Sequence, residues 1–123
     1  MSIKVLLADD AHAIRKAIRF LLIQDAEIEL VGEAVNFPQA VRMAAELKPQ
    51  IVIVDLHLAV RESKSDELQF TFAVFGCTAV AVSIWNDADS IALARRLGAV
   101  ALLDKANLAA ELVPSIRQLT NAS

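Results

Sequence analysis

Five short apolar runs recur along the chain, and a longer stretch with helical spacing separates each from the next. The runs are IKVLLADD (3–10), ELVGEA (29–34), IVIVDLHL (51–58), TAVAVSIW (78–85) and VALLDK (100–105). Several are rich in valine and isoleucine, which is typical of strands buried on both faces of a sheet. We therefore predict five β-strands.

Between these runs, apolar residues recur every three or four positions, which predicts amphipathic helices. The helices are expected over Ala11–Gln24, Asn36–Leu47, Ser65–Phe75 and Asp87–Leu97, with a last one after Asn107. Because Pro114 fits poorly inside a helix, we expect the last regular helix to begin near Glu111 or to bend there. The stretch AVRESKS (59–65) has no regular apolar pattern and is predicted to be an exposed polar loop.

Strand and helix alternate five times, which indicates an α/β fold with a parallel sheet between two layers of helices. The chain has 123 residues and is 56% hydrophobic, which suffices for the core of a single domain spanning 1–123. For five such units the common strand order is 2-1-3-4-5, which makes the first and third strands neighbours.

Charge and cysteine content narrow the function classes. The net charge of −3 leaves no basic surplus for a phosphate backbone, so direct nucleic-acid binding by this domain is not expected. The single cysteine, Cys77, fits a reducing compartment and is predicted to be a small buried hydrophobe. The N-terminal apolar run is too short for a signal peptide, and no run approaches the roughly 18 apolar residues of a membrane span. We therefore expect a cytoplasmic protein with no membrane partner.

Polar residues close four of the apolar runs. Asp9 and Asp10 follow the first, and the third, fourth and fifth end on Asp55, Ser83 and Lys105. In a doubly wound sheet, ligands bind at the carboxyl ends of the strands where the strand order reverses, so these side chains should meet there. Three neighbouring carboxylates repel one another unless a cation intervenes, and Mg²⁺ is a hard cation suited to them. A lysine and a serine hydroxyl beside them complete a site for phosphoryl transfer onto a carboxylate.

Each of these residues alone has a simpler interpretation. A pair of aspartates is usually a solvated turn or a helix cap, a strand-end lysine protects a sheet edge, and a serine in an apolar run bonds its own backbone. Five polar residues that each end the correct run favour the functional interpretation.

The motifs LLADD (6–10), IVIVDL (51–56), AVS (81–83) and LLDK (102–105) resemble those of receiver domains of two-component response regulators, of the chemotaxis-regulator type. The resemblance covers essentially the whole chain and implies a flavodoxin-like (βα)5 three-layer sandwich. It also implies phosphoryl transfer from a sensor histidine kinase or phosphotransfer protein, with Mg²⁺, or Mn²⁺ in its place, as cofactor. The phosphorylated domain would control an output or partner, with homodimerisation as one mode.

The resemblance also assigns roles to individual residues. Asp55 matches the phospho-acceptor, Lys105 the phosphate-pairing lysine and Ser83 the switch hydroxyl. The metal ligands are matched by carboxylates and one backbone carbonyl: Asp10, Asp55, Asp9 (mainly through water) and the carbonyl of His57. Such a protein is not an enzyme in the usual sense, but it catalyses its own phosphorylation and dephosphorylation.

Three positions depart from the family pattern. The stretch after Asp55 has neither Pro nor Gly where members often read Met-Pro-x-x-Asp-Gly, so a differently shaped loop is expected. Leu102 stands where an aromatic switch residue is common, which argues against signalling by an aromatic rotamer. Ala106 stands where a proline commonly follows the lysine. A cis bond at 105–106 is one alternative by analogy, but without proline it would cost about 3 kcal/mol.

The remaining candidates are weighed by position. The His57 side chain is expected at the rim of the site, and Trp85 either packs on that rim or covers the site. The basic group Arg15, Lys16 and Arg19 is most simply a solvated helix face, and next a partner surface.

Two rival functions stand beside phospho-acceptance. A pseudo-receiver would use the same fold as a scaffold that binds partners without phosphoryl turnover. An aspartyl-phosphate hydrolase of the haloacid dehalogenase type would need a second acid two residues after its nucleophile, and that position is His57 here. The sequence names neither the kinase nor the output, and leaves open whether the domain stands alone.

Overall fold

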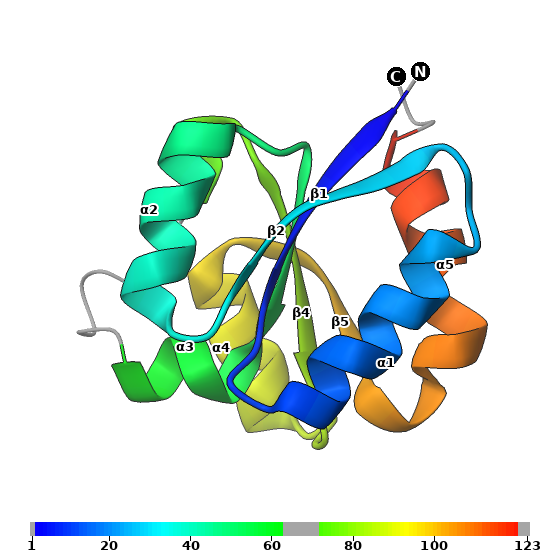
Figure 1. Cartoon of the computed structure of the whole chain (residues 1–123). Coiled ribbons are helices and arrows are strands. Elements are labelled where there is room, and N and C mark those ends of the chain that lie inside the picture. The colour runs from blue at the N-terminus through cyan, green and yellow to red at the C-terminus, as the bar shows by residue number, and fades with distance from the viewer. Residues whose placement is uncertain (1, 63–71, 121–123) are drawn as a thin grey trace.

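The computed structural model describes residues 2–62 and 72–120, which form one parallel sheet between two layers of helices (Figure 1). The strands are β1 (Ile3–Ala8), β2 (Ile28–Ala34), β3 (Ile51–Asp55), β4 (Thr78–Ser83) and β5 (Ala99–Asp104). Their order in the sheet is β2-β1-β3-β4-β5. The predicted fold class and strand order are therefore confirmed.

Helices cover both faces of this sheet. They are α1 (His12–Ile23), α2 (Phe37–Leu47), α3 (Leu56–Glu62), α4 (Ala88–Leu97) and α5 (Leu108–Thr120), with the 3₁₀ turns η1 (Ala73–Phe75) and η2 (Lys105–Asn107). Along β1, Val5 and Leu7 pack in the layer of α1 and α5, whereas Leu6 and Ala8 pack in the layer of α2 and α3. Burial on both faces explains why the strands appear in the sequence as continuous apolar runs.

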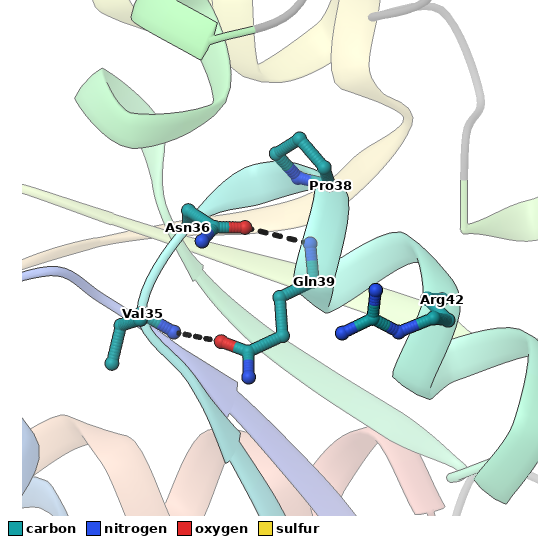
Figure 2. Close-up of a pocket in the computed structure, with 5 residues that line it drawn as sticks. All are labelled: Val35, Asn36, Pro38, Gln39 and Arg42. Carbon is teal, nitrogen blue, oxygen red and sulfur yellow. Dashed lines mark hydrogen bonds between the residues drawn. The ribbon is translucent and has the colours of Figure 1, made fainter.

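Asn36 caps the start of α2. Asn36 Oδ1 accepts a hydrogen bond from the Gln39 amide at 2.8 Å, and Gln39 Oε1 accepts one from the Val35 amide at 2.8 Å (Figure 2). Two amides at the helix start are thereby satisfied, as in a capping box. Pro38 and Arg42 join these residues in lining a surface pocket beside the helix start.

The segment after β3 differs from its prediction. The exposed polar loop predicted over 59–65 is wrong for the part that the structure describes, because α3 begins at Leu56 directly after the strand. The Asp55 carboxylate accepts a hydrogen bond from the His57 amide at 3.1 Å, which is the contact that an N-cap side chain makes. Ala59 is then fully buried.

The helix predicted over Ser65–Phe75 lies mostly outside the described residues. Its described end forms η1 rather than an α-helix, and Phe72 is fully buried. Gly76 closes the turn in the left-handed conformation, with φ at 78°, which glycine adopts without strain.

The last helix also begins earlier than predicted, at Leu108 rather than near Glu111, and continues through Pro114. Its face of Leu108, Leu112 and Ile116 is buried against the sheet, so packing outweighs the local cost of the proline.

Two further observations concern Cys77 and the length of the helices. Cys77 is a free, buried thiol in the apolar layer of α2 and α3, as expected. Among residues 2–62 and 72–120, no helix is both long and apolar enough to cross a membrane.

Candidate functional site

The carboxyl ends of β1 and β3 bring three aspartates together. Ala8 pairs with Val54 across the two strands, so the residues that follow, Asp9 and Asp55, lie side by side. With Asp10, each offers a carboxylate oxygen, and these oxygens lie within 4.8 Å of one another. The predicted gathering of the three carboxylates is observed.

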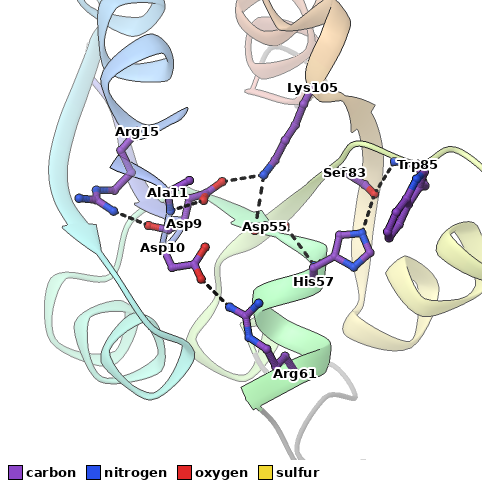
Figure 3. Close-up of polar contacts among 10 residues, drawn as sticks. All are labelled: Asp9, Asp10, Ala11, Arg15, Asp55, His57, Arg61, Ser83, Trp85 and Lys105. Carbon is purple, nitrogen blue, oxygen red and sulfur yellow. Dashed lines mark hydrogen bonds and ion pairs between the residues drawn. The ribbon is translucent and has the colours of Figure 1, made fainter. Parts of the chain in front are cut away.

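Lys105, at the end of β5, reaches two of these carboxylates (Figure 3). Its Nζ lies 3.0 Å from Asp9 Oδ2 and 3.5 Å from Asp55 Oδ2, and only 11% of its side chain is exposed. Asp9 Oδ2 is buried and accepts no hydrogen bond from the described residues, so its compensation is this ion pair. A buried lysine shared by two carboxylates is a fixed positive charge that an anion can also use.

Burial dominates the electrostatics of Asp55. It raises the pKa of the Asp55 carboxyl, and the neighbouring charge of Asp9 acts in the same direction, whereas Lys105 and the hydrogen bond from the His57 amide oppose the shift. A further positive charge beside Asp55 would lower the pKa of this carboxyl.

The donor set fits a hard divalent cation. Asp9, Asp10 and Asp55 offer only carboxylate oxygens, which Mg²⁺ and Mn²⁺ prefer over nitrogen and sulfur donors. No described residue donates a hydrogen bond to the buried Asp9 Oδ2, which therefore has lone pairs for a metal or for its water.

Ser83 lies on the other side of Asp55, at the end of β4. The serine is fully buried, and its Oγ accepts a hydrogen bond from the Trp85 amide at 3.0 Å. The Oγ is also 3.4 Å from His57 Nε2, and the imidazole meets the indole of Trp85 edge to face, with ring centroids 4.6 Å apart. His57 is thus at the rim as predicted, and Trp85, which is 55% exposed, packs on that rim.

The comparisons with known proteins agree with this geometry, although no protein-family model matches the chain. It is 29% identical over 115 residues to the transcriptional regulatory protein LiaR of Bacillus subtilis, a match covering 94% of this chain and 54% of LiaR. It is 42% identical over 62 residues to a protein-glutamate methylesterase/protein-glutamine glutaminase of Shewanella denitrificans, covering 50% of this chain and 16% of that protein. The response regulator domain of Thermotoga maritima CheB superposes with a TM-score of 0.84 at 25% identity, covering 100% of this chain and 99% of that one.

The chain belongs to the receiver domains of response regulators. It spans between 16% and 54% of the length of the two curated relatives just named. The similarity therefore concerns only part of each of those proteins, and the activities of the whole proteins are not carried over.

The receiver domain departs from its family pattern in the ways that the sequence suggests. Leu102 packs beside Leu56 and Ala94 in the layer of α3 and α4, so it presents no ring to that layer. The 105–106 bond is trans, since the described residues contain no cis peptide bond. Without proline, the cis form has no compensation for its cost.

The expected carbonyl ligand meets a different local structure. His57 lies in the first turn of α3, where helical geometry directs its carbonyl toward the amide of Arg61. Its role as a metal ligand stays a prediction.

Two arginines of the site were not foreseen. Arg61, in α3, lies 2.6 Å from Asp10 Oδ2 (Figure 3). Arg15, in α1, donates from Nη1 to the Asp9 carbonyl at 2.7 Å and is only 13% exposed, so it is not part of a solvated face. The sequence signal that could have identified Arg15 is its position, because it follows the aspartate pair closely and lies one helical turn into α1.

Proposed function

We propose that this receiver domain accepts a phosphoryl group on Asp55 from the phosphohistidine of a sensor histidine kinase or a phosphotransfer protein. The observation that carries the proposal is the position of Lys105 Nζ, 3.5 Å from Asp55 Oδ2 and 3.0 Å from Asp9 Oδ2. A lysine at this place pairs with phosphoryl oxygens as they arrive beside Asp55.

The transfer is a single displacement at phosphorus. A carboxylate oxygen of Asp55 forms the new O–P bond while the P–N bond to the donor histidine breaks, and the imidazole nitrogen keeps the electron pair. Lys105 takes up the charge of the phosphoryl oxygens at the buried end of the site. Asp9, Asp10 and Asp55 would hold Mg²⁺ or Mn²⁺, which supplies charge neutralisation for the same oxygens when bound.

Ser83 is the proposed reporter of phosphorylation. Its hydroxyl now accepts from the Trp85 amide, and a phosphoryl group on Asp55 offers it a stronger, charge-assisted acceptor. Reorientation of Ser83 would release the loop that leads into α4, and the surface of α4 and β5 would carry the signal to an output, by homodimerisation or partner docking.

The wider setting follows from the same proposal. The 123 residues act as a single receiver domain in the cytoplasm, with a kinase or phosphotransfer partner and without direct contact to nucleic acid or membrane. The domain contributes to its own phosphorylation and dephosphorylation.

A pseudo-receiver is the second candidate, and one observation favours it. Arg61 occupies Asp10 Oδ2, and the His57 carbonyl lies within the first turn of α3, so two expected metal ligands are engaged with other groups. A domain locked in this arrangement would bind partners without phosphoryl turnover.

Labelling by acetyl phosphate separates the two candidates. With Mg²⁺ present, intact-protein mass spectrometry should show one added phosphoryl group on the parent protein and none on Asp55→Asn. Asp104→Asn is the matched control, because Asp104 also ends a strand at this edge but caps η2 and lies outside the cluster. Labelling that persists in Asp55→Asn would refute the acceptor assignment, and no labelling of the parent protein would favour the pseudo-receiver.

A further inference from the structure

Two side chains of α3 lie on either side of Asp55, the proposed acceptor. His57 and Arg61 are one helical turn apart and therefore share a face of the helix. His57 approaches Ser83, whereas Arg61 extends to Asp10, so the two reach opposite sides of Asp55 (Figure 3). This arrangement depends on α3 beginning directly after β3.

The arginine completes the charge balance of the acidic cluster. The three carboxylates of the cluster face two cations, because Lys105 serves Asp9 and Asp55 while Arg61 serves Asp10. When all five groups are charged, the sum of three negative and two positive charges is −1. The protein's own side chains therefore neutralise most of the charge that would attract a metal.

The two cations differ in how easily they can leave. The side chain of Lys105 is 11% exposed and pairs with a buried carboxylate, whereas Arg61 is 57% exposed and Asp10 is 46% exposed. Exposed ion pairs are weak and are screened by salt, so water can replace the Arg61 contact at little cost. Arg61 is the displaceable cation of the site.

We propose that Arg61 is a built-in competitor of the divalent cation at Asp10. In the metal-free domain it holds Asp10 through Oδ2, and the metal and the guanidinium exclude each other from that carboxylate by charge and by space. Arg61 thereby lowers metal affinity, and metal loading releases the Arg61 side chain from Asp10. The inference rests on the proposed function, because it takes the acidic cluster as the metal site.

Calorimetric titration with Mg²⁺ tests the proposal. Arg61→Gln should bind Mg²⁺ about two- to fivefold more tightly than the parent protein, the range expected for loss of an exposed ion pair. The advantage should shrink at high ionic strength. Arg61→Lys keeps the charge and should stay closer to the parent. Arg117→Gln is the matched control, because it removes the same charge from ion pairs with Asp25 and Glu27, which precede β2 at the opposite end of the sheet, and its affinity should match the parent.

The outcomes separate this inference from the proposed function. Equal Mg²⁺ affinity in the parent protein and Arg61→Gln would overturn the inference alone, and so would weaker binding, which would mean that Arg61 orients Asp10 for the metal. Absence of Mg²⁺ binding in both proteins would overturn the inference and the metal site together. Thermal melts supply a second readout: Mg²⁺ should raise the melting temperature of Arg61→Gln by more than it raises that of the parent protein or of Arg117→Gln.

Discussion

At the scale of single residues, the Glu33 carboxylate pairs with two basic side chains of α1. Arg19 donates to both of its oxygens, from Nε at 2.8 Å and Nη2 at 2.9 Å, and Arg15 Nε lies 3.5 Å away. Because Arg15 also donates to the Asp9 carbonyl, the carboxylate on β2 helps to fix the loop that carries the acidic cluster. A surface ion-pair group thus contributes to the geometry of the site.

The same contacts make Glu33 sensitive to pH. The hydrogen bond from Arg19, followed in effect by the charges of Arg19 and Arg15, holds the pKa of Glu33 below its ordinary value of 4.5, against the effect of burial. A lowered pKa in the folded state adds stability above the unfolded pKa, and this stability is lost as the pH falls through the folded value. Arg19→Gln should therefore raise the pKa of Glu33, measured by carbon-detected NMR titration. It should also lower the melting temperature at pH 7 more than at pH 3. An equal loss at both pH values would show that Arg19 acts through packing alone.

Helix α5 shows how tertiary packing overrides a local signal at the scale of elements. Pro114 has no amide hydrogen, and a proline inside a helix also crowds the carbonyl four residues earlier. The helix nevertheless runs from Leu108 to Thr120, because its apolar face is buried against the sheet. Pro114 itself is exposed and makes no part of that face.

Replacing this proline should stabilise the domain. Pro114→Ala restores the missing hydrogen bond and removes the clash, with an expected gain of about 1–3 kcal/mol in the free energy of unfolding, after allowing for the freer unfolded chain. Urea denaturation at fixed pH measures the change, and Ser115→Ala controls for helix propensity alone. A gain no larger than that of Ser115→Ala would mean that α5 has already relaxed around the proline.

Helix α3 was the element that the sequence predicted least well. Its described end reads as polar because Arg61 and Glu62 are charged, and its first turn depends on an aspartate to which the sequence also gives a chemical role. In the structure the Asp55 carboxylate serves both purposes, since it caps the helix and faces Lys105. An aspartate at this position looks the same in a sequence whether it caps a helix, belongs to a site or does both.

At the scale of the whole molecule, alternation of strands and helices was sufficient to predict the fold and the acidic cluster. Parallel strands place their carboxyl ends at one edge, so Asp9 and Asp55 had to meet once β1 and β3 were neighbours. The pairing of Arg61 with Asp10, across 51 positions of sequence, depends instead on where α3 begins and on the rotamers of long side chains. Neither the start of α3 nor the choice of rotamer leaves a periodic pattern of apolar residues in the sequence.

Ser83 contacts both α3 and the loop that leads into α4. Its hydroxyl contacts the Trp85 amide of the loop before α4 and lies 3.4 Å from the ring of His57 in α3. Leu102 has no ring to swing, so the signal is expected to start from this hydroxyl. A difference of a few kcal/mol between two states of the loop would suffice to shift their populations.

Amide hydrogen exchange with and without beryllofluoride, a phosphoryl mimic, tests this route. The mimic on Asp55 should draw the Ser83 hydroxyl inward, free the Trp85 amide and change protection across residues 83–90. The change should vanish in Ser83→Ala, which has no hydroxyl, and should persist in Ser83→Thr, which keeps one. Beryllofluoride binding is checked separately in each variant, so that a lost response is not confused with a lost ligand. If the change centres on residues 56–62 and survives Ser83→Ala, then α3 is the switch, and the route through Ser83 is wrong.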